Sequence, residues 1–183
     1  MARVQGCCLF DTAIGACGVA WTDDALAAVQ LPETTRDRTL QRMLRHCGEA
    51  GEADPPAFVQ AAITRIRQLL EGARDDLADL PLDLQGVPPF HRKVYAVARG
   101  IPPGQVLTYG EVARRLGEPG ASRAVGQALG HNPFAPVVPC HRVLAAGGRS
   151  GGFSAEGGAD TKLRMLEIEK ARFSDEPGLF DVD

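Results

Sequence analysis

The chain has 183 residues, of which 44% are hydrophobic and 23% are charged, a composition that predicts a globular protein with a buried core. No run of about 18 apolar residues occurs, and no long apolar stretch follows the N-terminus, so we expect neither a transmembrane helix nor a signal peptide and place the protein in the cytoplasm. Five cysteines, an odd number in a chain expected to be intracellular, argue against a disulfide framework and predict at least one free thiol.

The charged residues are unevenly distributed along the chain. The net charge of −3 alone argues against a nucleic-acid partner. Residues 1–89 hold 8 basic and 13 acidic side chains, a net of −5, whereas residues 90–170 hold 11 and 6, a net of +5. Residues 171–183 return to −3 with 1 basic and 4 acidic side chains. A basic segment inside an acidic chain permits contact with phosphate without proving it.

The N-terminal third has the pattern of a hairpin followed by helices. Apolar residues alternate over 17–21, a turn follows at Asp23-Asp24, and a second apolar strand covers 26–31. Apolar residues then recur at helical spacing over 39–47 and again over 57–70. We therefore predict a small sheet with two helices in this part.

The rest of the chain reads as a second, mostly helical domain. A proline-bounded extended stretch, 79–89, precedes three amphipathic helices, and a Gly-containing turn between the last two is typical of a helix-turn-helix. An apolar extended run, a glycine-rich loop and a closing helix are expected next. The predicted helices, the extended run and the closing helix span 90–101, 107–117, 121–132, 134–148 and 161–172. The predicted division is an N-terminal α/β domain with its linker, a C-terminal domain and an acidic tail, at 1–88, 89–171 and 172–183.

The phrase VPCHRV at 138–143 carries the candidate chemistry. A thiol is nucleophilic only as thiolate, and the adjacent imidazole of His141 could take the proton of Cys140 directly or through a water. Neighbouring side chains of an extended segment point to opposite faces, so this transfer requires a turn or a bridging water, and Pro139 could supply the bend. A buried structural cysteine beside an ordinary histidine is the alternative that the two residues alone leave open.

The surrounding residues change that balance. Between about residues 80 and 170 the chain holds, in this order, IPPGQVLTYGEVARRLG, ASRAVGQALGHNPFAPVVPCHRV, GGFSAEGG and KLRMLEIE. This series resembles the 6-O-alkylguanine-DNA alkyltransferases, also called methylated-DNA–protein-cysteine methyltransferases. The resemblance implies an α/β two-domain fold, with a ribonuclease-H-like N-terminal domain and a winged helix-turn-helix-like C-terminal domain that carries the active-site cysteine.

The resemblance also implies catalytic roles. Cys140 matches the acceptor thiol, and His141 matches the general base that acts through a water. Glu169 matches the glutamate that orients this imidazole and favours its cationic form. Asn132 matches an asparagine that ties the turn before the active-site strand, and Tyr109 matches the tyrosine that hydrogen-bonds guanine N3 and so helps the leaving group.

DNA contacts and the base pocket follow from the same matches. Arg123 matches the arginine that enters the space vacated by an extruded nucleotide. Small residues let the second helix of the pair approach a groove, and further arginines are candidate phosphate contacts. These groove and phosphate candidates are Ser122, Ala124, Gly126, Arg114, Arg115, Arg142 and Arg149. Val143, Phe153 and Ser154 are expected to line the guanine pocket with Tyr109.

The implied function is DNA repair by direct reversal. The alkyl group of 6-O-methylguanine, or of 4-O-methylthymine, in double-stranded DNA would pass irreversibly to Cys140, once per molecule, in a monomer without cofactor or metal. The alternatives are a non-enzymatic sensor of alkylated DNA and a helix-turn-helix regulator. A cysteine-protease-like hydrolase is disfavoured because the helix pair would have no task in it. The loop GGFSAEGG departs from the common family pattern, which leaves the range of alkyl groups open.

Overall fold

We describe the protein from a computed structural model, which defines residues 3–146 and 158–171. Its N-terminal part is a three-stranded antiparallel sheet in the order β1-β2-β3. The strands span Gly6–Thr12, Gly15–Trp21 and Leu26–Gln30. The two strands predicted within 17–31 are confirmed as β2 and β3. The alternation rule misses β1 because its centre, CCLF at 7–10, is a continuous apolar run, and short runs of this kind carry no period.

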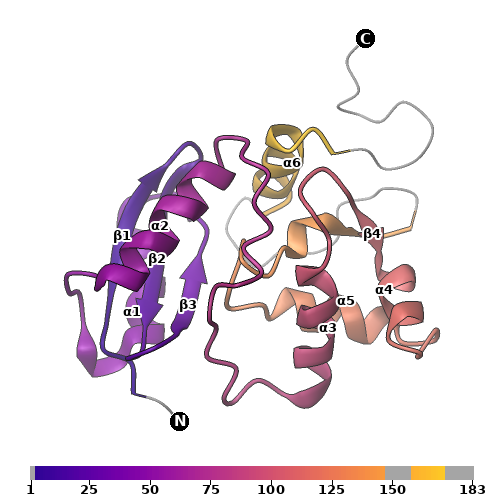
Figure 1. Cartoon of the computed structure of the whole chain (residues 1–183), viewed down its shortest axis with the longest axis horizontal. Coiled ribbons are helices and arrows are strands. Elements are labelled where there is room, and N and C mark those ends of the chain that lie inside the picture. The colour runs from indigo at the N-terminus through magenta and orange to yellow at the C-terminus, as the bar shows by residue number, and fades with distance from the viewer. Residues whose placement is uncertain (1–2, 147–157, 172–183) are drawn as a thin grey trace.

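Two helices cover opposite faces of this sheet (Figure 1). Helix α1, Arg36–Cys47, packs Met43 and Cys47 against the sheet face that presents Ala20. It begins three residues before the predicted range because the side chain of Thr35 caps its N-terminus, accepting a hydrogen bond from the Arg38 amide at 3.2 Å. The short 3-10 helix η1, Gly48–Ala50, follows it, and helix α2, Ala57–Leu69, packs on the other face.

The C-terminal part consists of short helices around a two-stranded parallel pair (Figure 1). Helix α3 presents Val94, Tyr95 and Ala98 to the core, and the half-buried Phe90 and Val97 pack against it. The elements are α3 Pro89–Arg99, β4 Leu107–Thr108, α4 Tyr109–Arg115, α5 Ser122–Gly130, the 3-10 helix η2 Cys140–Arg142, β5 Val143–Leu144 and α6 Gly158–Ile168.

The prediction of an extended run over 134–148 is wrong. A turn follows Asn132, the chain then folds into η2, and within the described part of this range, 134–146, only Val143–Leu144 is a strand. Proline at 136 and at 139 explains the failure, because proline cannot donate to a ladder and confines its neighbours to turn and bend conformations. The predicted acidic tail and the glycine-rich loop lie outside the described residues.

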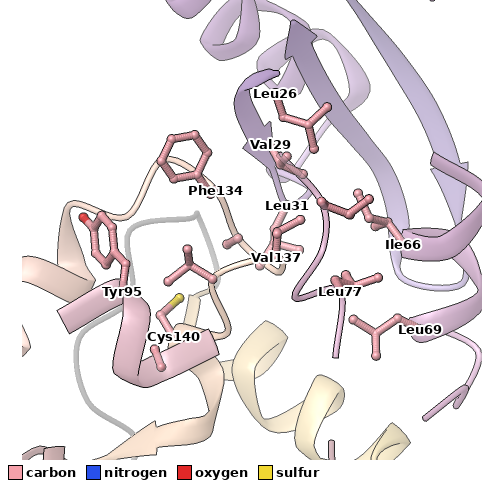
Figure 2. Close-up of a cluster of buried hydrophobic side chains, with 14 of the residues drawn as sticks. Leu26, Val29, Leu31, Ile66, Leu69, Leu77, Tyr95, Phe134, Val137 and Cys140 are labelled. Carbon is pink, nitrogen blue, oxygen red and sulfur yellow. The ribbon is translucent and has the colours of Figure 1, made fainter. Parts of the chain in front are cut away.

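The edge of the sheet holds the segment that leads to η2. The amide of Val29 in β3 donates to the carbonyl of Pro133 at 2.9 Å, and Val29 bridges Phe134 in parallel. One core therefore runs from the sheet through Phe134 and Val137 to Cys140, as Figure 2 shows. The thiol thus belongs to a core that both parts of the chain share.

None of the helices within residues 3–146 and 158–171 combines the length and the apolar composition that crossing a bilayer requires.

Tyr95 gives a direct test of this shared core. Its hydroxyl is buried and donates to the carbonyl of Ala128 in α5 at 2.8 Å, which ties α3 to α5. We expect Tyr95→Phe to lower the free energy of unfolding by about 1 kcal/mol, the net value of one such hydrogen bond. Urea denaturation followed by circular dichroism measures this change, and a stability equal to that of the wild type would contradict the assigned contact.

Candidate active site

Cys140 lies in a tight turn that the buried side chain of Asn132 stabilises. Its amide donates to the carbonyl of Val138 at 2.8 Å, and the chain then turns through η2. Asn132 donates from Nδ2 to that same carbonyl at 2.8 Å and accepts from the Phe134 amide at 2.9 Å. The amide side chain therefore fixes the loop at two points. The turn expected between thiol and imidazole is present, with Pro139 directly before it.

His141 and Glu169 form a buried pair. The imidazole Nε2 lies 2.8 Å from Glu169 Oε1, and the two residues are 0% and 3% exposed. An ionised carboxylate can only accept, so Nε2 carries the hydrogen and Nδ1 keeps a free lone pair. Nδ1 is buried and has no hydrogen-bond partner among the described residues. It is the atom of this pair that can exchange a proton with the thiol.

Arg142 turns inward and completes the pair. Its Nε and Nη2 contact Oε2 and Oε1 of Glu169 at 3.0 and 2.7 Å, and its Nη1 donates to the Ile101 carbonyl at 2.8 Å. The expectation that Arg142 contacts phosphate is wrong, because the side chain is 1% exposed. A buried carboxylate requires a cationic partner, and this arginine supplies it.

The charges in this network settle which groups are ionised. Burial raises the pKa of Glu169, but His141 and Arg142 outweigh it and lower that pKa to about 2. Burial lowers the pKa of His141 below its ordinary value, against the charge and hydrogen bond of Glu169. At neutral pH the network therefore holds a carboxylate, a guanidinium and a neutral imidazole, which is the state of a base able to accept a proton.

The thiol of Cys140 is protonated in this environment. It is 6% exposed, and burial raises its pKa, whereas a hydrogen bond from Asn132 and the charge of Lys162 act to lower it. A base is therefore needed to form the thiolate. Asn132 and Lys162, which favour the thiolate, already lie beside Cys140.

Lys162 is a residue of this site that sequence reasoning missed. It is 1% exposed, donates from Nζ to the Val143 carbonyl at 2.8 Å, and lies 6.0 Å from the ring centroid of Tyr109. Burial lowers its pKa to about 8. The signal was present in the sequence: Lys162 and Glu169 are seven residues apart, so a helix places them on one face, with buried Met165 between them.

Tyr109 is the first residue of α4, where the side chain of Thr108 caps the helix by accepting from the Glu111 amide at 3.1 Å. The phenol is half-buried, and burial raises its pKa, so it remains a hydrogen-bond donor at neutral pH. A Cβ atom at Gly126 of α5 would lie 3.8 Å from the ring. Gly126 therefore faces Tyr109, a placement that its assignment to the DNA groove does not anticipate.

The remaining candidates divide by exposure. Arg123, Arg114 and Arg115 are exposed, Ser122 and Ala124 are half-buried, and Val143 is fully buried with its carbonyl bonded to Lys162. Arg149, Phe153 and Ser154 lie outside the described residues. The structure thus brings together Cys140, His141, Glu169 and Asn132, adds Arg142 and Lys162 to them, and leaves the exposed arginines on the helix pair.

A buried thiol beside a neutral imidazole that a carboxylate holds is typical of a cysteine-nucleophile protein. Exposed arginines on a helix pair are typical of a DNA-binding domain. Comparison with known families agrees with this class: residues 89–171 match the family model described as the DNA-binding domain of 6-O-methylguanine DNA methyltransferase.

Similarity to individual proteins identifies the family within this class. The methylated-DNA–protein-cysteine methyltransferase of Mycobacterium bovis is 42% identical over 128 residues, which cover 70% of this chain and 74% of that protein. The protein of the same name from Mycolicibacterium paratuberculosis is 34% identical over 93% of this chain and 96% of its own length. A crystal structure of Mycobacterium tuberculosis OGT in complex with DNA has a TM-score of 0.72 and 35% identity, covering 90% of this chain and 92% of that one. The chain therefore belongs to the methylated-DNA–protein-cysteine methyltransferase family.

The inward orientation of Arg142 leads to a stability prediction. Arg142→Met leaves the buried Glu169 without its cation, and we expect a loss of about 3–5 kcal/mol in the free energy of unfolding. Arg115→Met, at an exposed position, serves as the control and should change it by less than about 0.5 kcal/mol. Guanidinium titration of both variants measures the difference. Equal stabilities would show that Arg142 does not stabilise a buried charge.

Proposed function

We propose that the protein repairs DNA by accepting the alkyl group of 6-O-methylguanine on Cys140, irreversibly and once per molecule. The observation that carries this proposal is the buried set of Cys140, His141 and Glu169, in which a neutral base, oriented by an ionised carboxylate, lies in the turn that holds the thiol. Membership of the family and the likeness to a protein crystallised with DNA support the same conclusion.

The transfer begins with the thiol proton. His141 accepts it at Nδ1 through a water, and Glu169 stabilises the imidazolium that forms. The charge of Lys162 favours the thiolate of Cys140 during this step. Since the resting thiol is buried and protonated, the nucleophile forms only inside the site, away from other electrophiles.

The thiolate then attacks the methyl carbon in line with the carbon–oxygen bond. A carbon–sulfur bond forms, the carbon–oxygen bond breaks, and its electron pair stays on guanine oxygen 6. The purine anion needs a donor as its charge develops, and the phenol of Tyr109 supplies a hydrogen bond at N3. The proton that His141 took from the thiol passes on to the departing guanine anion, which leaves both His141 and guanine neutral. The net exchange is therefore a methyl group for a hydrogen. A thioether has no easy return to thiol, which makes the protein single-turnover.

The helix pair would present the lesion. A base inside a duplex must leave the stack before its oxygen 6 can be reached. Arg123, exposed near the start of α5, would enter the gap, and half-buried Ser122 and Ala124 would allow close approach to a minor groove. Exposed Arg114 and Arg115 on α4 are suited to phosphate contact.

The proposal extends to the fold type of each domain. Residues 1–88 would form a ribonuclease-H-like domain and residues 89–171 a winged helix-turn-helix-like domain, with the α4–turn–α5 unit as its DNA-reading part. Methyl transfer from 4-O-methylthymine is included, because it presents the same alkyl–oxygen bond. The five cysteines are all free thiols, which suits a reducing compartment and supports the cytoplasmic location. A pure lesion sensor or regulator would have no use for a nucleophile with its base, which Cys140 and His141 provide.

Intact mass tests the proposal. After incubation with a duplex that contains one 6-O-methylguanine, the wild-type protein should gain the mass of one methyl group in place of a hydrogen, and no more with excess duplex. Cys140→Ala should gain nothing, whereas Cys8→Ala, which removes a half-exposed thiol elsewhere, should gain the full increment. Methylation of the Cys140→Ala protein would refute the assignment of the acceptor.

Arg123 and Arg115 separate two kinds of DNA contact. Arg123→Ala should slow methyl transfer from duplex DNA by about tenfold or more, because the extruded state loses a part of the few kcal/mol that offset unstacking, and should leave transfer from a single strand unchanged. Arg115→Ala should weaken DNA binding on any sequence and reduce the slope of log K against log salt by about 1. Single-turnover kinetics and fluorescence anisotropy measure the two effects. Identical behaviour of both variants on both substrates would contradict the assigned roles.

A further inference from the structure

An arginine from the N-terminal half reaches the backbone of the catalytic glutamate. Arg74, in the loop that follows α2, donates from Nη1 to the carbonyl of Glu169 at 3.0 Å and to the carbonyl of Pro103 at 3.0 Å. Glu169 is thus held by two guanidinium groups, since Arg142 contacts its carboxylate. One cation fixes the side chain, and the other fixes the main chain that bears it.

The local backbone is shaped for this contact. Helix α2 ends at Leu69, and Gly72, with φ of +106°, turns the chain towards the end of α6, where its Cβ position lies 3.9 Å from the Ile168 carbonyl. Gly104 has φ of +91°, and a Cβ atom there would lie 2.5 Å from Arg74 Nη1. Glycine at 104 therefore serves both the turn and the approach of the guanidinium.

The contact lies where α6 needs a cation. The last carbonyls of a helix have no partner within it and carry partial negative charge, and Lys170, with φ of +54°, leaves the helical conformation directly after Glu169. Pro103 belongs to the same loop as Ile101, whose carbonyl accepts from Arg142. Arg74 therefore ties the end of α6 to the loop on which the Arg142–Glu169 pair also depends.

We propose that Arg74 is a positioning residue for alkyl transfer, which holds the main chain of Glu169 so that its carboxylate stays aligned with His141. This inference rests on the proposed function. Its consequence is that the N-terminal half contributes to the activation of Cys140 through the contact of Arg74 with the Glu169 backbone.

Arg164 provides a matched comparison within the same chain. From α6 its Nη2 donates to the carbonyl of Ala13 in the β1–β2 turn at 2.8 Å. This contact also joins α6 to the N-terminal half by an arginine and a backbone carbonyl, but it does not involve Glu169. If docking of the two halves were all that mattered, removal of either arginine would have the same effect.

The sign of the expected change follows from the charges around His141, which are those of Glu169, Arg142 and Lys162. Of these only Glu169 favours the imidazolium, and the imidazolium favours the thiolate of Cys140. A misplaced carboxylate therefore weakens proton uptake from the thiol. Fewer molecules then hold the thiolate–imidazolium pair, so the rate falls at pH values where His141 is neutral. The limb of the rate profile that follows proton loss from the imidazolium moves to the acidic side, because the pKa of His141 is lower without its carboxylate.

The experiment compares Arg74→Ala, Arg74→Lys, Arg164→Ala and the wild type, each first shown to be folded by its thermal midpoint. Single-turnover methyl transfer from saturating duplex is measured from about pH 5 to pH 9. We expect Arg74→Ala to be about fivefold slower at neutral pH, equivalent to one hydrogen bond of about 1 kcal/mol, with the shifted limb. Arg74→Lys should recover part of the rate, and Arg164→Ala should keep the wild-type profile.

A second readout separates this inference from the function on which it rests. Alkylation of Cys140 by iodoacetamide, followed by peptide mass mapping, reports thiolate formation without DNA, and Arg74→Ala should show the same slowing at neutral pH. Equal profiles for Arg74→Ala and Arg164→Ala in both assays would overturn the positioning role. A wild-type protein that reacts with iodoacetamide at Cys140 but takes no methyl group from DNA would instead overturn the proposed function.

Discussion

The structure around the thiol depends on one buried carboxylate. Glu169 shares its two oxygens between His141 and Arg142, and no other cation contacts them among the described residues. Its charge fixes the tautomer of the imidazole and keeps Nδ1 free for a proton, while the guanidinium offsets the cost of burying that charge. Since these three residues come from η2 and the end of α6, the site exists only when the chain has closed over sequence separations of 27 and 28.

The rest of the fold maintains this closure. The segment before Cys140 pairs with the edge of β3, where the Val29 amide donates to the Pro133 carbonyl, and a common core joins the sheet to the thiol. Lys162 lies on the same face as Glu169 and adds a cation beside the nucleophile. Burial thus has two effects: it suppresses the thiolate at rest, and it strengthens each charge that favours the thiolate once a substrate has excluded water.

Much of this was predictable from residue types and spacing. Apolar periodicity places α1, α2, α4, α5 and α6 within a few residues, and the residues around VPCHRV point to the family and to the Cys140–His141 pair. Periodicity could not place β1, since its run has no alternation, nor the turn at η2, where prolines override an apolar stretch. Arg142 was misassigned because local sequence does not tell whether an arginine points to solvent or to a carboxylate 27 residues further on. The contacts of Arg74 are visible only in the structure, because its partners are backbone carbonyls, which every residue has.

The protonation state of His141 decides whether this network can activate Cys140. Nitrogen-15 NMR of the histidine-labelled protein at neutral pH, with His141 assigned by its substitution with Gln, distinguishes the neutral tautomers from the imidazolium. We expect a neutral ring that is protonated at Nε2 and bare at Nδ1, beside an ionised Glu169. A ring protonated at both nitrogens, or a neutral ring with its hydrogen on Nδ1, would contradict this expectation, because neither could accept the proton of Cys140 in this geometry.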